Sequence, residues 1–140
     1  MAFAPRRNKL VFDGNLPPTG VTVTSDTIAS VPYDGKLLTV ESQFTYGSSG
    51  TTAKLYVQTS LDDGDSWFDI ACHAFTTATA KKISAVCRAV APASQAFAPT
   101  DGTLADDTVV NGVLGDRIRV KLVVVGTYAS TSLRVDVVFN

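Results

Sequence analysis

Residues 117–139 read RIRVKLVVVGTYASTSLRVDVVF, and this stretch decides the fold class. Its apolar residues occupy every second position in two runs. The short stretch GTYAST at residues 126–131 separates these runs. Such period-two alternation is typical of β-strands with one face in a core and the other in water. The positions expected to face inward are Ile118, Val120, Leu122, Val124, Leu133, Val135, Val137 and Phe139.

The same alternation recurs upstream, and no segment of useful length has the spacing of an amphipathic helix. Seven or eight short strands in one chain predict an all-β, antiparallel two-sheet sandwich of jelly-roll-like form, because a single open sheet would leave one face uncovered. Short turn sequences separate the runs and predict antiparallel neighbours on either side of each turn. The upstream inward positions are Leu38, Val40, Phe44, Tyr46, Leu55, Val57 and Thr59, and the turns are Asp34–Gly35, Gly47–Gly50, Asp63–Gly64 and Gly126–Thr131.

A length of 140 residues corresponds to one domain with a core of its own. Residues 1–20 contain three prolines and are predicted to form an extended N-terminal arm, followed by a sandwich domain over residues 21–140. Within that domain, residues 91–115 are too long for an ordinary connection. Their alanine, valine and phenylalanine content predicts that they fold against the sandwich or against a neighbour.

Composition argues against several classes of partner. The net charge of −1 lacks the basic excess that a nucleic-acid binder uses to neutralise phosphates. No apolar run approaches the length of a membrane span or of a signal-peptide core, so we expect no membrane partner and synthesis in a cytoplasm.

Cysteine and histidine are too few for a structural zinc site, so no metal and no cofactor are expected. If residues 68–75 and 82–90 form a hairpin, Cys72 lies directly across from Cys87, and we expect packed free thiols rather than a disulfide. His73 alternates with apolar neighbours and is predicted to face outward. No nucleophile, base and orienting group can be assembled around it, so the sequence predicts no enzyme activity.

The segment SLDDGDSW at residues 60–67 resembles the Asp box of sialidase-type propellers and other β-proteins. We interpret it as a structural turn, in which a carboxylate accepts backbone hydrogen bonds, a glycine adopts positive φ and an indole ring covers the turn. The acidic residues on this turn and at positions 106 and 107 are interpreted as solvated or capping groups, with a weak calcium site as the alternative. The turn residues are Ser60, Asp62, Gly64 and Trp67.

Two longer segments, YVQTSLDDGDSWFDIA at 56–71 and GVLGDRIRVKLVVVGTYASTSLRVDV at 112–137, together with the proline-containing arm, resemble small virion proteins of tailed bacteriophages and gene transfer agents. The resemblance implies a non-enzymatic structural role in head decoration, a head spike, a fibre base, or the neck or tail. It implies capsid, portal, neck or fibre proteins as partners, a homo-oligomer, and a location in the virion after synthesis in the host bacterium.

The attachment surface is predicted on the arm and the long loop, because exposed apolar side chains on an arm are costly unless a partner covers them. The candidate interface residues are Arg6, Arg7, Lys9, Leu10, Val11, Phe12 and Phe97.

Two other classes of function remain open at this point. A carbohydrate-binding sandwich module would present aromatic rings to sugars, and a glycosidase would use paired carboxylates. The candidate rings are Trp67, Tyr46, Tyr56 and Tyr128.

Overall fold

The computed structural model describes residues 7–25, 27, 36–88 and 98–139, except for the side chains of residues 7–10. This part of the chain contains ten strands and no helix, so no helix in it could cross a membrane. The strands are β1 (Arg7–Asn15), β2 (Thr22–Thr24), β3 (Leu37–Thr45), β4 (Ser48–Ser49), β5 (Thr52–Ser60), β6 (Phe68–Phe75), β7 (Ala80–Cys87), β8 (Arg117–Val125), β9 (Tyr128–Ala129) and β10 (Ser132–Phe139).

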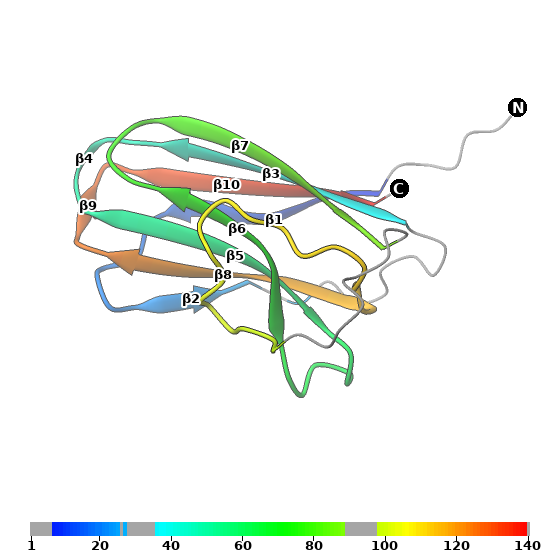
Figure 1. Ribbon diagram of the computed structural model, residues 1–140. Coiled ribbons are helices and arrows are strands. Elements are labelled where there is room, and N and C mark those ends of the chain that lie inside the picture. The colour runs from blue at the N-terminus through cyan, green and yellow to red at the C-terminus, as the bar shows by residue number, and fades with distance from the viewer. Residues whose placement is uncertain (1–6, 26, 28–35, 89–97, 140) are drawn as a thin grey trace, which may run out of the picture.

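Eight strands form two antiparallel four-stranded sheets that face each other (Figure 1). Sheet A has the order β1-β10-β3-β7 and sheet B the order β2-β8-β5-β6. Along the chain these strands alternate between the two sheets, except for the hairpin β5–β6. This is the strand order of a jelly roll, so the predicted all-β sandwich is confirmed.

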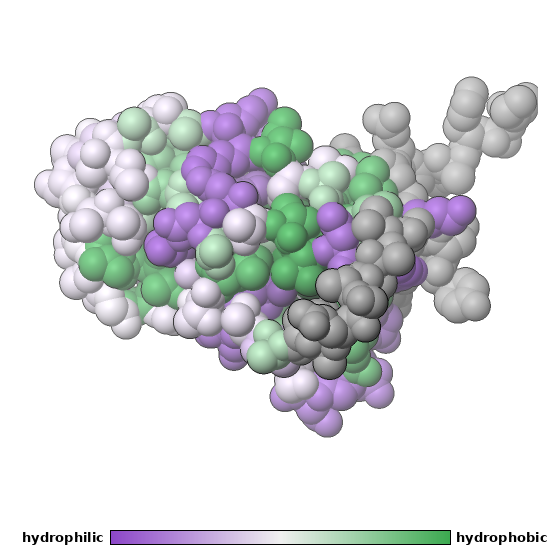
Figure 2. All heavy atoms as spheres, in the orientation of Figure 1, coloured by the Kyte–Doolittle hydropathy of each residue, from purple (hydrophilic) through white to green (hydrophobic). Residues whose placement is uncertain are grey.

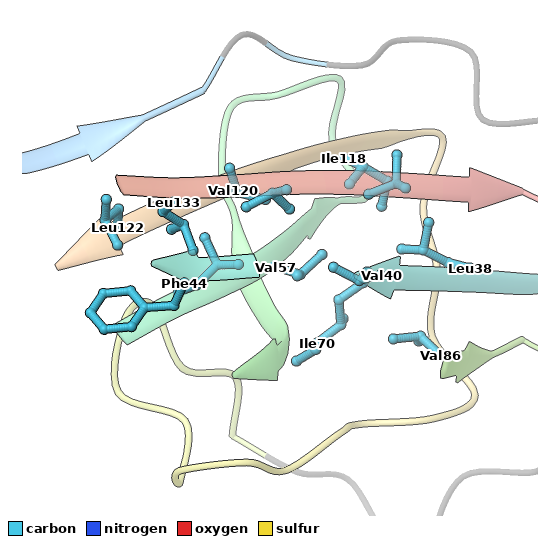
Figure 3. Packing of buried hydrophobic residues seen from close by; sticks show 14 of the residues in the cluster. Leu38, Val40, Phe44, Val57, Ile70, Val86, Ile118, Val120, Leu122 and Leu133 are labelled. Carbon is cyan, nitrogen blue, oxygen red and sulfur yellow. The ribbon is translucent and has the colours of Figure 1, made fainter. Parts of the chain in front are cut away.

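The core between the sheets is built from the alternating positions. Side chains of β3, β7 and β10 meet those of β5, β6 and β8, as Figure 3 shows for ten labelled residues. The alternation follows from the pleat, which sends every second side chain to the same face. The largest fully buried apolar side chains are Phe44, Leu38, Leu55, Ile70, Ile118, Leu122 and Leu133.

Two glycine-containing turns lead from one sheet to the other. Residues 46–51 connect β3 to β5 and residues 126–131 connect β8 to β10, and β4 pairs with β9 where these corners meet. The prediction that both turns separate paired neighbours is therefore wrong. Gly50 has a φ of +77°, and a Cβ there would lie 2.4 Å from the Tyr128 ring, so the corner requires glycine.

Among the other predicted turns, Asp63–Gly64 does join paired strands, β5 and β6. The turn Asp34–Gly35 lies outside the described residues.

Part of the predicted extended N-terminal arm is a strand of the sandwich. Residues 7–15 form β1, an edge strand that pairs with β10 from Arg7 opposite Phe139 to Asn15 opposite Ser132. Proline excludes a segment from central strands but not from an edge, and the prolines of this region flank β1. Its half-buried residues Val11 and Phe12 pack against the core, so they are covered within the domain.

Residues 98–112, here called the covering segment, lie against the outer face and free edge of β6 (Figure 1, yellow). Ala71 and Val109 form an antiparallel bridge, Cys72 N donates to Thr108 O at 3.0 Å, and Val110 N donates to Ile70 O at 2.9 Å. Of the two predicted alternatives for the long loop, this part folds against its own sandwich. Residues 91–97 lie outside the described residues.

Candidate functional site

The turn at residues 60–67 is held by hydrogen bonds from its own side chains. Ser60 Oγ donates to Asp62 Oδ1 at 2.8 Å and accepts from Gly64 N at 2.8 Å. The second half of the turn is fixed by Ser66, whose backbone N and Oγ donate to the two carboxylate oxygens of Asp62 at 2.8 and 2.5 Å. Gly64 has a φ of +92°, which suits glycine.

The indole of Trp67 closes this turn. Its Nε1 donates to Gly64 O at 3.1 Å, and the guanidinium carbon of Arg119 lies 4.5 Å from the ring centroid. A cation at this distance over an indole face is attracted by the ring. One face of the ring is therefore occupied by the protein itself.

The hydrogen bonds to Asp62 hold its pKa at about 2, below the ordinary value of 3.8; the largest contribution comes from the hydroxyl of Ser66. A carboxyl whose folded pKa is depressed stabilises the fold above its unfolded pKa, and this contribution is lost as the pH falls through the folded pKa. We therefore expect wild-type protein to lose stability between pH 4 and pH 2 faster than Asp62→Asn. Chemical denaturation at several pH values measures this, and parallel curves for the two proteins would contradict it.

A second polar cluster lies under the covering segment, on the outer face of sheet B. The carboxylate of Asp69, which is 2% exposed, accepts from three consecutive backbone N–H groups, those of Gly102, Thr103 and Leu104, at 2.8–3.2 Å. It also accepts from Thr100 Oγ1 at 2.8 Å. Successive N–H groups directed at one anion form a nest, and here the anion is a side chain of the protein itself.

Gln58 extends this cluster across β5. Its Nε2 donates to Asp69 Oδ1 at 2.9 Å and to Asp101 Oδ1 at 2.6 Å, and its Oε1 accepts from Arg119 Nε at 2.9 Å. Lys121 Nζ reaches the same Asp101 oxygen at 2.9 Å. The hydrogen bond from Lys121, followed by that from Gln58, lowers the pKa of Asp101. The hydrogen-bonding capacity of this cluster is used to fix the covering segment.

His73 is buried, 4% exposed, and the prediction that it faces outward is wrong. A bulge lies between Val57 and Gln58 in the β5–β6 pairing, so the side-chain alternation shifts by one residue along β6. His73 Nδ1 lies 2.5 Å from Ser42 Oγ of β3, and its Nε2 lies 2.8 Å from Ser84 Oγ of β7. The ring thus joins sheet B to sheet A.

The chemistry available at His73 is limited by its surroundings. Burial lowers its pKa, so the neutral ring is favoured. The pair formed with Ser84 has the distance of a nucleophile and its base, but the other ring nitrogen meets a serine hydroxyl instead of an orienting carboxylate. We interpret the arrangement as a polar contact between the sheets.

The two cysteines are free and lie on different sheets. Because β6 belongs to sheet B and β7 to sheet A, the predicted hairpin does not form. Cys72 lies opposite Tyr56, and Cys87 lies opposite Leu37. Burial raises the pKa of Cys72 to about 11, which disfavours the reactive thiolate.

The aromatic residues considered for sugar binding are largely internal. Tyr56 is 4% and Tyr128 8% exposed. Tyr46 lies edge-on to Tyr128, with ring centroids 6.1 Å apart. With Arg119 over Trp67, these four residues do not form an open aromatic platform.

The acidic residues at the ends of loops form ion pairs. Asp106 lies 2.8 Å from Lys54, and Asp107 lies 2.8 Å from Lys82. Across the described ranges, no three His, Cys, Asp or Glu side chains come together as a metal site would need.

The predicted interface residues are only partly within the described structure. Arg6 and Phe97 lie outside it, and for Arg7, Lys9 and Leu10 only the backbone, in β1, is described. The half-buried positions of Val11 and Phe12 remove the need for a partner to cover them.

The outer face of sheet A has no covering segment in the described structure. Side chains of β3, β7 and β10 surround a shallow hollow of about 420 Å³ there. Its charges are paired within the sheet: Arg134 Nε with Asp136 at 3.0 Å, and Lys81 Nζ with Glu41 at 3.5 Å. The hollow is lined by Thr39, Glu41, Gln43, Ile83, Arg134, Asp136 and Val138.

The side of the molecule that Figure 2 draws has a mixed character. Figure 2 shows hydrophobic and hydrophilic residues interspersed in small groups on the face it draws, which includes the covering segment. Large apolar side chains exposed singly are normal on protein surfaces.

Comparisons with family models, with curated proteins and with solved structures found no match to this chain.

Proposed function

We propose that the chain is a non-enzymatic structural protein of a virion, attached to the head as a decoration, spike or fibre base, or to the neck or tail, through protein–protein contacts. The sequence resemblance to small virion proteins suggests this role. Jelly rolls occur in viral capsid domains, although a fold alone does not imply a function.

The observation that carries the proposal is the difference between the outer faces of the two sheets. The face of sheet B is covered at β6 and beside it by the chain's own residues 98–112, and the polar groups there bond to each other. The face of sheet A is bare in the described structure, and its charges are paired. A shallow surface of paired charges and scattered apolar groups suits contact with another protein. We therefore place the attachment surface on sheet A.

Particle association tests this role. The chain is co-expressed with the virion genes of its source, and particles purified by density are analysed by mass spectrometry. We expect wild-type protein in the particles, and at least tenfold less of a Thr39→Arg/Val138→Arg variant, because two long cations on the bare face obstruct close contact. Portal, major capsid or tail-tube genes beside its own gene would support the same proposal.

The matched control is Thr77→Arg, a cation at an exposed position in the β6–β7 turn. Absence of the wild-type chain from the particles would contradict the virion role. Normal incorporation of the double variant would leave that role standing and move the attachment surface elsewhere.

A further inference from the structure

Strand β7 is an edge strand whose outward backbone groups are open within the described residues. Arg88 N donates to Lys36 O at 2.8 Å, which fixes the residues of β7 that face β3. In an antiparallel pair, alternate residues direct both backbone groups to the same side. The N–H and C=O groups of Lys81, Ile83 and Ala85 therefore point away from the sheet, and they meet no partner in the described part of the chain.

Cys87 follows Lys81, Ile83 and Ala85 in this alternation, and its backbone groups do point away from the sheet. Cys87 N donates to Asn111 Oδ1 and Cys87 O accepts from Gly112 N, both at 2.8 Å. The covering segment thus closes one end of the β7 edge, and no other described residue bonds to the remaining outward backbone groups.

The neighbouring edge of sheet B is closed by the same segment. Thr108 and Val110 bond to β6, and the backbone N of Ala74 donates to Asp107 Oδ1 at 3.1 Å. The other edge of sheet A, β1, carries an irregularity between Leu10 and Phe12, and such bulges discourage further pairing. Among these edges, β7 is the long one left both regular and open.

A hollow runs beside the open edge. Its volume is about 200 Å³, and it is bordered by β7 on one side and by the covering segment on the other. Sheet B, with the covering segment beside β6, is one strand wider than sheet A, so the hollow lies where a fifth strand of sheet A would run. Its lining is Cys72, His73, Lys82, Ile83, Ser84, Asp107, Thr108 and Val109.

We propose that the β7 edge binds an extended segment of another polypeptide, which adds to sheet A as a fifth strand. Only an extended chain offers donors and acceptors at the spacing of the open groups. One small side chain of that strand occupies the hollow, and its neighbours on the opposite side pack beside Ile83, which is 62% exposed. The proposal rests on the proposed function only in requiring a protein partner.

Charge selects the chemistry of this partner. Strand β7 carries Lys81 and Lys82 and no acidic residue. Lys82 is held by Asp107 at 2.8 Å, whereas Lys81 lies 3.5 Å from Glu41 and its side chain is 55% exposed, which leaves room for a second carboxylate. An acidic residue on the incoming strand complements Lys81, whereas a second copy of β7 brings four lysines to one junction. Edge lysines discourage pairing between copies of the same strand. The partner is accordingly a different chain with a carboxylate near Lys81.

A designed peptide tests the site on the full chain. The probe is the capped nonapeptide TETVAVTET, which places alanine toward the hollow and valine and glutamate on the face of Ile83 and Lys81. We expect saturating peptide to slow amide hydrogen exchange at Lys81, Ile83 and Ala85 at least tenfold, with no comparable change on β1. Absence of protection at millimolar peptide, or protection confined to another strand, would overturn the proposal.

Two variants address the backbone and the hollow separately. Ile83→Pro removes an outward N–H and leaves the β3 ladder intact, as proline can at an edge. Ile83→Thr retains the N–H and is its matched control. If proline disturbs folding, Thr108→Phe fills the hollow from the covering segment. We expect Ile83→Pro or Thr108→Phe to weaken peptide binding at least tenfold and Ile83→Thr to preserve most of it.

Other occupants are outcomes of the same experiments. If the wild-type protein sediments as a dimer and Ile83→Pro abolishes the dimer, the edge binds a second copy of the chain, and the proposal of a different partner is overturned. Absence of peptide protection, combined with the wild-type chain in the particles, would overturn the edge proposal while the virion role stood. Peptide protection combined with absence of the wild-type chain from particles would leave the edge site standing and overturn the virion role.

Discussion

Asp69→Ala is expected to lower the free energy of unfolding by about 3–5 kcal/mol, because it removes the shared acceptor of several hydrogen bonds at once. The substitution leaves the N–H groups of Gly102, Thr103 and Leu104, which are part-buried, without their acceptor, and a donor left unsatisfied away from water costs about 1–3 kcal/mol. It also removes one acceptor of the Gln58 amide. Urea denaturation followed by circular dichroism measures the change.

The matched control is Asp65→Ala, an exposed acidic residue on the β5–β6 turn, for which a change within about 0.5 kcal/mol is expected. Hydrogen exchange adds a local readout, because the amides of Gly102, Thr103 and Leu104 should exchange faster in Asp69→Ala. A loss below about 1 kcal/mol would show that the covering segment is held by its bridge to β6 instead.

Phe44→Ala is expected to cost about 3–5 kcal/mol, the usual effect of truncating a buried aromatic side chain. Its ring is 1% exposed and stacks on Phe75 with centroids 4.8 Å apart. It also meets the edge of Tyr128 at 5.7 Å, next to the corner that contains Gly50. The cavity left by the ring would therefore loosen the packing between the two sheet-to-sheet corners.

Thr45→Ala, at the exposed neighbouring position, controls for the change in strand propensity and should have an effect below about 1 kcal/mol. Thermal and chemical denaturation of both variants measure the difference. A loss below about 2 kcal/mol for Phe44→Ala would mean that neighbouring side chains collapse into the space.

Alternation in the sequence was sufficient to predict the sandwich. In β8 and β10 every expected inward residue is buried, because in a regular strand the pleat alone determines the face. The same rule failed for His73, since the register shift opposite Val57 exchanges the two faces of β6. A bulge of this kind leaves no clear signal in alternation.

Turn composition gave less information about topology. Gly50 and Gly126 both have positive φ, as hairpin glycines often do, yet they stand in corners between sheets. Local backbone preference is the same in the two settings, and the choice depends on packing by distant residues such as Tyr128. The turn residues alone therefore do not determine whether the two strands that they connect pair with each other or belong to different sheets.

The polar cluster under the covering segment was missed, although a signal existed. Gln58 and Asp69 are polar residues at positions facing each other on two strands that also carry the core. Polar side chains there need buried partners, and a long loop containing Asp101 and Gly102 could supply them. The open edge of β7 had no sequence signal, because it depends on the register with β3 and on where the covering segment ends.

The pairing of β1 with β10 has a mechanical consequence. Arg7 lies opposite Phe139, so the outer ends of these two neighbouring strands emerge side by side at the same pole of the domain (Figure 1). Tension applied between these ends pulls along the hydrogen bonds and opens the pairs one at a time, as in a zipper. Tension applied between this pole and the corners at the opposite pole loads the strands lengthwise, and many hydrogen bonds must then break together. The domain should therefore resist force far better between its opposite poles than between the neighbouring outer ends of β1 and β10.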